Sequence, residues 1–149
     1  MNISKFRYPI DKDQFQVIRE QGMLYVDKTD MMYDLADRYT YVFLARPRRF
    51  GKSLLCNTFK AYFKGQKELF EGLKVMELEK EWKKYPVLHF ILSGLKDCGI
   101  PEAKSKLEAF IGDYEAVYGR NEADKTPGAR FRSLIHNAFA LTGEKVVVI

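Results

Sequence analysis

Hydrophobic residues in this chain form short continuous runs, and these are separated by stripes of apolar residues at helical spacing. The continuous runs predict buried β-strands at residues 41–45 (YVFLA), 87–93 (VLHFILS) and 145–149 (KVVVI). The stripes predict helices around Phe15 and Ile18 and over residues 27–39, 53–65, 107–118 and 131–139, with a mixed-charge helix before Pro86. We therefore predict an α/β fold with a mostly parallel sheet flanked by helices, in one domain.

Local signals refine this frame in the first half of the chain. Residues 23–26 (MLYV) predict a brief strand or an extended piece. The helix that follows has Asp27 or Thr29 as its N-cap, since both residue types accept hydrogen bonds from exposed helix N–H groups. Trp82, inside the charged stretch before Pro86, is interpreted as an anchor of the core.

The composition is that of a soluble globular protein, with 46% hydrophobic and 30% charged residues. No apolar run approaches the roughly 20 residues of a membrane span, and the first ten residues lack a signal pattern, so we expect a cytoplasmic protein without a membrane partner. Cys56 and Cys98 lie in no C-x-x-C motif, which favours two reduced thiols over a disulfide. His89 and His136 are interpreted as structural histidines.

The positive charge is concentrated in one stretch. Lys and Arg total 25 and Asp and Glu total 20, and residues 41–60 contain five basic residues and no acid. The rest of the chain holds 20 residues of each sign, so this stretch accounts for the whole net charge of +5. A positive site focused in this way indicates an anionic partner.

The same stretch has the pattern of a phosphate-binding loop. A predicted strand at 41–45 leads into the loop 46–52, and a predicted helix begins at Ser53. In such loops backbone N–H groups and the positive end of the helix face the phosphates, here with Gly51 allowing close approach. Lys52 would add a charge at the outer phosphates, and the hydroxyl of Ser53 would hold Mg²⁺. The first glycine of the usual G-x-x-x-x-G-K-[ST] pattern is replaced by Arg46, followed by Pro47, which can also form a turn.

Other functional classes stay open at this point. The basic cluster formed by Arg46, Arg48, Arg49 and Lys52 could grip the phosphates of a nucleic acid directly. The predicted placement of Phe and Tyr at core positions argues against it, because single-strand binders expose aromatic side chains for base stacking. A third reading is an interaction-only remnant of a catalytic protein. The absence of an N-K-x-D-like motif leans weakly toward ATP over GTP.

Several longer motifs carry a resemblance to a known family. The stretches FQVIREQGMLYVDKTDMMYDL, YVFLARPRRFGKSLLCNTFKAYFKG and YPVLHFILS resemble the AAA-ATPase-like domain of predicted bacterial and archaeal ATP-binding proteins. In that family R-P-R-R-F-G-K-S is itself the form of the Walker A loop. The resemblance covers the whole chain and implies that residues 1–149 are the N-terminal portion of a P-loop NTPase-like domain, truncated at its Walker B strand.

The resemblance also implies the site. ATP and Mg²⁺ are the implied cofactors of a hydrolase-type switch or motor, with Lys52 as the catalytic residue and Ser53 as the metal ligand. The implied nucleotide-binding residues are Arg46, Pro47, Arg48, Arg49, Phe50, Gly51, Lys52, Ser53 and Leu54, with Asp27 and Lys28 from Y-V-D-K-T. Asp27 is equally explained as a helix cap. Arg48 and Arg49 could be phosphate ligands, an arginine pair acting across an oligomer interface, or solvated loop charges.

One departure from the family pattern affects catalysis. The family continues its third strand, here residues 145–149, into an acidic D-E-Y-D element, and this sequence supplies no such acids there. We therefore expect this chain to bind ATP but not to hydrolyse it efficiently. Because ligands of parallel sheets bind at the carboxyl ends of the strands, Ile149 is predicted to end beside Ser53. Family members often carry a C-terminal PD-(D/E)XK nuclease-like domain, absent here, through which nucleic acid would be a partner.

Overall fold

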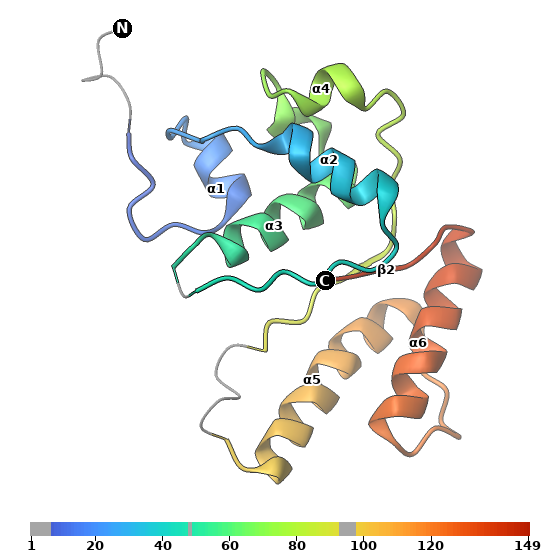
Figure 1. The fold of residues 1–149 in the computed structure, drawn as a ribbon. Coiled ribbons are helices and arrows are strands. Elements are labelled where there is room, and N and C mark those ends of the chain that lie inside the picture. The colour runs from blue at the N-terminus through green and yellow to red at the C-terminus, as the bar shows by residue number, and fades with distance from the viewer. Residues whose placement is uncertain (1–6, 48, 93–97) are drawn as a thin grey trace, which may run out of the picture. The chain divides into compact units, whose positions relative to one another are not determined.

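The chain divides into two compact units, Met1–Lys84 and Tyr85–Ile149. A computed structural model describes residues 7–47, 49–92 and 98–149 (Figure 1). None of the helices in these ranges is long and apolar enough to cross a membrane.

The first unit is helical in its described part. It contains α1 (Phe15–Glu20), α2 (Thr29–Arg38), α3 (Lys52–Phe63), the 3₁₀ turn η2 (Lys67–Phe70) and α4 (Val75–Leu78). Glycines with positive φ follow α1 at Gly22 and α3 at Gly65, and residues of this kind commonly end helices. Of residues 23–26, Met23 forms an isolated parallel bridge with Arg7, and the described chain has no named strand there.

Aromatic packing forms the core of this unit. The Phe70 ring lies 4.8 Å from Phe15 and 5.1 Å from Trp82, measured between ring centroids, and Tyr62 meets Trp82 edge-on at 5.9 Å. Around them the buried hydrophobic residues are Phe15, Met32, Ala61, Tyr62, Leu69, Phe70, Leu73 and Val75. The prediction that Trp82 anchors the core is confirmed.

The mixed-charge helix predicted before Pro86 is wrong. The helix α4 ends at Leu78, and Trp82 has a φ of 48°, which an α-helix does not allow. The carboxylate of Glu79 accepts hydrogen bonds from the backbone N–H groups of Glu81 (2.8 Å) and Trp82 (3.3 Å). A local side-chain acceptor has replaced the helical pattern, and the turn that it forms directs Trp82 into the core.

The second unit contains a parallel strand pair. Its elements are β1 (Val87–Leu88), α5 (Ile100–Tyr118), α6 (Pro127–Thr142) and β2 (Val147–Val148). The strands pair with Val87 opposite Val147 and Leu88 opposite Val148. Parallel pairing of the runs at 87–93 and 145–149 is thus confirmed, although each strand is shorter than its apolar run.

Two helices connect these strands and supply their cover. Leu88, Ile111 and Leu134 form the buried centre of this unit, one each from β1, α5 and α6. Thr126 caps α6 by accepting a hydrogen bond from the N–H of Ala129 (3.3 Å). Gly143, with a φ of 71°, ends the helix.

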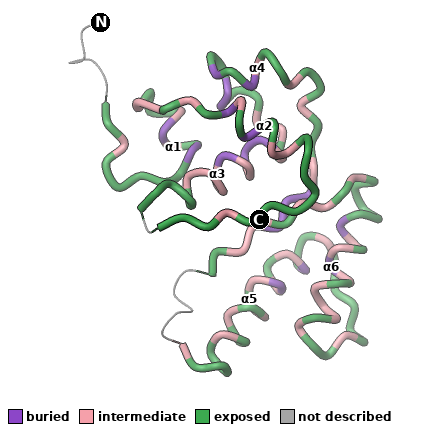
Figure 2. Tube along the Cα trace, in the orientation of Figure 1, coloured by how far each residue is buried: buried purple, intermediate pink, exposed green. Residues whose placement is uncertain are grey.

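The strand predicted at 41–45 is not formed. Tyr41 and Phe43 are each 93% exposed, and Figure 2 shows an almost continuously exposed trace over residues 39–47, after the end of α2. Among the described residues the sheet contains β1 and β2 alone. The fold is therefore mixed helix and sheet, but the predicted larger parallel sheet is present only as this pair. The physical reason is that a β-strand requires a partner for its backbone, and Tyr41–Ala45 has none in the described chain.

Candidate functional site

The loop before α3 has a backbone that only particular residues adopt easily. Gly51 is the N-cap of α3, with φ 76° and ψ 18° in the left-handed region. Arg49, two residues earlier, also has a positive φ of 65°, which is uncommon for a residue with a side chain. Alternation of such conformations turns backbone N–H groups toward one side and is a recurrent feature of anion-binding loops.

Lys52 closes this loop on itself. Its ammonium group donates a hydrogen bond to the backbone carbonyl of Arg46, six residues earlier. The side chain of the first residue of α3 therefore folds back along the loop instead of extending into solvent. The ammonium group of Lys52 therefore lies against a neutral carbonyl oxygen. An anionic oxygen in the place of that carbonyl would form a stronger hydrogen bond with it.

The beginning of α3 is open to an anion. Among the described residues no side-chain hydrogen bond caps the start of α3, so the positive end of the helix dipole is open there. Arg46, Arg49 and Lys52 are exposed around it. Ser53, also exposed, stands at the second helical position. The backbone N–H groups at the start of α3 and the positive charges of Arg46, Arg49 and Lys52 therefore lie within one short segment.

The rest of α3 fixes that segment to the core. Leu54 and Leu55 pack against the aromatic cluster from the first turn, and Thr58, Ala61 and Tyr62 are buried further along. Asn57 donates a hydrogen bond to the carbonyl of Asp13 (3.0 Å). Burial raises the pKa of the Cys56 thiol, which keeps it protonated. Neither Cys56 nor Cys98 is in a disulfide, as predicted.

Asp27 holds two distant helix starts together. One carboxylate oxygen accepts hydrogen bonds from the N–H (2.9 Å) and hydroxyl (2.7 Å) of Thr29, and the other accepts from the N–H of Lys74 (2.8 Å). The hydroxyl of Thr29 in turn accepts from the N–H of Val75 (3.1 Å). The D-x-T spacing in Y-V-D-K-T thus supplies the missing cap of α4, 46 to 47 residues away in sequence.

The electrostatics of Asp27 agree with this structural role. Partial burial acts to raise the pKa of its carboxyl group, but the hydrogen bonds from Thr29 and Lys74 outweigh burial and hold the pKa below its ordinary value. The exposed ammonium of Lys74 pairs with Asp30 at 2.8 Å. Lys28 is exposed and is the residue at the N-cap of α2. These contacts account for Asp27 without a ligand, and a nucleotide contact by Asp27 or Lys28 stays a prediction.

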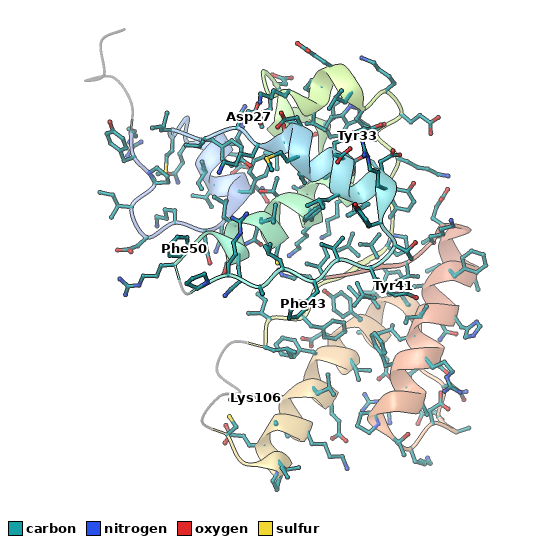
Figure 3. All side chains as sticks on the ribbon, in the orientation of Figure 1. Asp27, Tyr33, Tyr41, Phe43, Phe50 and Lys106 are labelled. Atoms are coloured by element: carbon teal, nitrogen blue, oxygen red, sulfur yellow. The ribbon has the colours of Figure 1, made fainter. Side chains whose placement is uncertain are left out.

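Figure 3 shows Asp27 at the start of α2 and Phe50 on the loop before α3. The sequence could indicate the Asp27–Thr29 contact, because an acid two residues before a threonine at a helix start is a common turn. It could not indicate Lys74 and Val75, whose contribution depends on the fold. Arg48 lies outside the described residues. The predicted proximity of Ile149 and Ser53 joins two units and stays a prediction.

The aromatic residues near the loop differ from their prediction. Tyr41 and Phe43 are 93% exposed, although they were expected in the core, and Phe50, which the sequence places in the loop, is 61% exposed. The argument against nucleic acid from buried aromatics therefore fails for these three residues. Their exposure follows from the unpaired strand at 41–45 and from the open loop.

Magnesium would find one ligand of the expected kind at this site. A serine hydroxyl at a helix start is a suitable donor for Mg²⁺, which in nucleotide sites takes most of its remaining ligands from phosphate oxygens and water. Ser53 has this position and exposure. Within the described ranges no group of three His, Cys, Asp or Glu side chains could hold a metal ion by itself.

Comparisons with known proteins agree with the loop pattern. A family described as "Predicted AAA-ATPase" matches residues 9–149. A protein of Azotobacter chroococcum mcd 1, described as an uncharacterized protein in the vnfD 5' region, is 35% identical over 148 residues. That alignment covers 99% of this chain but 29% of the relative, so the chain spans less than a third of the relative's length. No solved structure matches this chain.

Proposed function

Since this chain belongs to the predicted AAA-ATPase family, we propose that residues 46–53 bind the phosphates of ATP or ADP in a domain of the switch or motor type. The observation that carries the proposal is Lys52, folded back to the carbonyl of Arg46 beside an uncapped helix start.

Each residue of the loop has a distinct part in binding. The backbone N–H groups at the start of α3 donate to phosphate oxygens, helped by the helix dipole. Lys52 exchanges the Arg46 carbonyl for an outer phosphate oxygen and so strengthens its hydrogen bond. Ser53 directs its hydroxyl to the Mg²⁺ that accompanies ATP, and Arg49 adds a screened, longer-range attraction. Bound Mg²⁺ would neutralise phosphate charge.

Binding and turnover are separate in this proposal. Turnover requires a carboxylate that positions the attacking water and the metal's water ligands. Residues 41–60 contain no acid, and neither do residues 145–149, where the resemblance implies such groups follow. We therefore propose that the 149-residue chain binds nucleotide and hydrolyses it only slowly.

The decisive experiment compares two lysines at opposite ends of α3. Lys52→Ala removes a charge-assisted hydrogen bond, so affinity for Mg²⁺-ATP in isothermal titration calorimetry should fall about tenfold or more. Lys64→Ala removes the same charge just beyond the other end of α3 and should change affinity less than twofold. If the wild type and Lys52→Ala bound Mg²⁺-ATP with equal affinity, the assignment of residues 46–53 as the phosphate site would be wrong. Titration with GTP, and without Mg²⁺, then tests base preference and the part of Ser53.

The exposed aromatics favour a second candidate, single-stranded nucleic acid. Tyr41, Phe43 and Phe50 flank or interrupt the basic loop, and exposed rings beside positive charge are the components of a stacking platform. If nucleic acid were the partner, Arg49→Ala would flatten the salt dependence of binding by about one unit of slope. We expect only weak, non-specific binding. Tight binding at physiological salt would reverse the order of the two candidates.

A further inference from the structure

The chain that enters α1 is fixed in place at both of its ends. The carbonyl of Arg7 accepts a hydrogen bond from the N–H of Leu24 (2.8 Å). At the other end, the carbonyl of Asp13 accepts a hydrogen bond from the side chain of Asn57 on α3 (3.0 Å). Because each end is bound to a different part of the first unit, the turn between them, residues 8–13, has a defined position relative to α3.

That position is beside the candidate phosphate loop. Asn57 lies four residues after Ser53 on α3, so the two residues are neighbours about one helical turn, roughly 6 Å, apart along the helix axis. Figure 1 shows the chain entering α1 next to the first turns of α3. Residues 8–13 and 46–53 belong to the same compact unit. A ligand held by its phosphates at the start of α3 therefore has the turn as a close neighbour.

The turn is ordered and yet exposes apolar side chains. The N–H of Ile10 donates to the carbonyl of Tyr8 (2.9 Å), and the N–H of Lys12 donates to the carbonyl of Pro9 (3.3 Å). Asp11 has a positive φ of 54°, which aspartate tolerates better than most residues with a side chain. Tyr8 and Ile10 are nevertheless 55% and 77% exposed. Turns are usually built from small and polar residues, so the turn itself does not account for these two side chains.

The charge of the turn decides which part of a nucleotide it could contact. Asp11 and Asp13 are exposed and carry two negative charges, against one positive charge at Lys12. A turn of this sign repels phosphates, whereas its carboxylates accept hydrogen bonds from hydroxyl and amino groups. The sugar hydroxyls and the exocyclic amino group of a nucleoside are such donors, and its flat base stacks on aromatic rings.

We propose that residues 8–13 form the nucleoside subsite of the nucleotide site, in which the base stacks on Tyr8 beside Ile10 while the phosphates lie at residues 46–53. The inference rests on the proposed function, because it requires phosphates at the start of α3. Asn57 is then a positioning residue. It contacts no part of the nucleotide and holds the turn at a fixed distance from the loop through the carbonyl of Asp13.

Titration with two ligands that differ mainly in the nucleoside tests the inference. Mg²⁺-ATP carries the base and the sugar, and Mg²⁺-tripolyphosphate carries phosphates alone. In isothermal titration calorimetry we expect the wild type to bind ATP at least about tenfold more tightly, because stacking of one base on an aromatic ring by itself accounts for about fivefold or more. Lys52→Ala should weaken both ligands, since it removes a charge that acts on the phosphates they share.

Variants of Tyr8 should separate the two ligands. Tyr8→Ala should weaken ATP binding about fivefold or more and leave the affinity for tripolyphosphate within about twofold of the wild type. Tyr8→Phe keeps the ring and should bind both ligands like the wild type. Tyr39→Ala is the matched control, at a tyrosine that follows α2 and is 57% exposed, and it should change neither affinity by more than about twofold.

Asn57→Ala tests the positioning of the turn separately. It removes the hydrogen bond to Asp13 and leaves the side chains of the turn unchanged. ATP binding should weaken about threefold or more, and binding of tripolyphosphate should stay within about twofold. A merely structural role of Asn57 would change both affinities together or neither. Urea unfolding followed by the fluorescence of Trp82 establishes that each variant is folded at the temperature of the titration.

The possible failures are distinct from one another. If the wild type bound ATP and tripolyphosphate equally, the inference would be wrong and the phosphate site would stand. If ATP were favoured but Tyr8→Ala kept that preference, the base would lie elsewhere, and the inference would again be wrong. If Tyr8→Ala weakened the binding of oligothymidylate but not of ATP, the turn would belong to a nucleic-acid site. If the wild type bound neither ATP nor tripolyphosphate, the proposed function would fail, and the inference with it.

Discussion

Replacing Thr29 by valine tests whether the Y-V-D-K-T motif is structural. The side chain is fully buried, its hydroxyl donates to Asp27 (2.7 Å), and it accepts from the N–H of Val75 (3.1 Å). Valine has nearly the same shape but can make neither hydrogen bond. The buried N–H of Val75, at the start of α4, would lose its acceptor.

The expected loss of stability follows from these contacts. Two hydrogen bonds contribute roughly 1 kcal/mol each, and the unsatisfied N–H of Val75 adds about 1 kcal/mol of desolvation. A buried methyl group in place of the hydroxyl offsets about 1 kcal/mol. The net loss is about 2 kcal/mol, which lowers the melting temperature of a unit of this size by about 10 °C.

Fluorescence of Trp82 follows this unit alone. It is the single tryptophan of the chain, and it packs against Phe70 and Tyr62 in the core that also contains Val75. Urea unfolding followed at Trp82 should give the free energy of unfolding of wild type and Thr29→Val. Calorimetric titration with Mg²⁺-ATP at a temperature where both are folded should give equal affinities.

A second buried threonine in the same unit provides the control. The hydroxyl of Thr58 donates to the carbonyl of Leu54 (2.8 Å), which already accepts a helical N–H. Thr58 also has a hydrogen bond with Tyr25, but Thr58→Val leaves no backbone N–H without an acceptor, so it should destabilise less than Thr29→Val. If Thr29→Val were as stable as the wild type, the cap assigned to Thr29 would be wrong. If Thr29→Val were stable but bound ATP more weakly, the Y-V-D-K-T motif would instead belong to the nucleotide site.

Three further predictions follow from the fold and the loop. Glu115 is buried and accepts two hydrogen bonds from the partly buried Arg130 (2.9 and 2.6 Å), so Glu115→Gln should cost roughly 1–2 kcal/mol in urea unfolding followed by helical circular dichroism. The hydrogen bonds from Arg130 hold the pKa of Glu115 below its ordinary value, so this contribution to stability is present above about pH 4.3 and is lost as the pH falls through the lowered pKa. This one contribution should be missing from the pH dependence of the Gln variant. In Gly51→Ala the added methyl group would meet no atom within 4 Å, but alanine would be forced to a φ of 76°. The substitution should therefore weaken ATP binding and lower the free energy of unfolding by about 1 kcal/mol. Gly128→Ala, also in open space but without a positive φ, should do neither. Phosphate release by residues 1–149 should be negligible even when ATP is bound, and turnover at an ordinary ATPase rate would refute the need for downstream carboxylates.

The sequence by itself determined the elements whose signals are local. The apolar stripes located α1, α3, α5 and α6, because a helix satisfies its own backbone and needs only one apolar face for packing. Glycine at positions 22, 65 and 143 marked where helices end, since the left-handed residue there belongs to the cap itself. The basic loop before α3 was readable for the same reason, as its composition and its neighbouring helix lie within one short stretch.

Only the tertiary structure decided what depends on distant partners. Residues 41–45 have the composition of a strand, but a strand forms only when another backbone pairs with it, and the described chain provides none. The sequence predicted a local helix cap at Asp27 or Thr29. In the structure both side chains also accept hydrogen bonds from the N–H groups at the start of α4, which only folding brings near them. Lys52 was predicted as a phosphate ligand from its place in the motif. Its hydrogen bond to Arg46 depends on the path of the loop between them, which positive φ angles at Arg49 and Gly51 set.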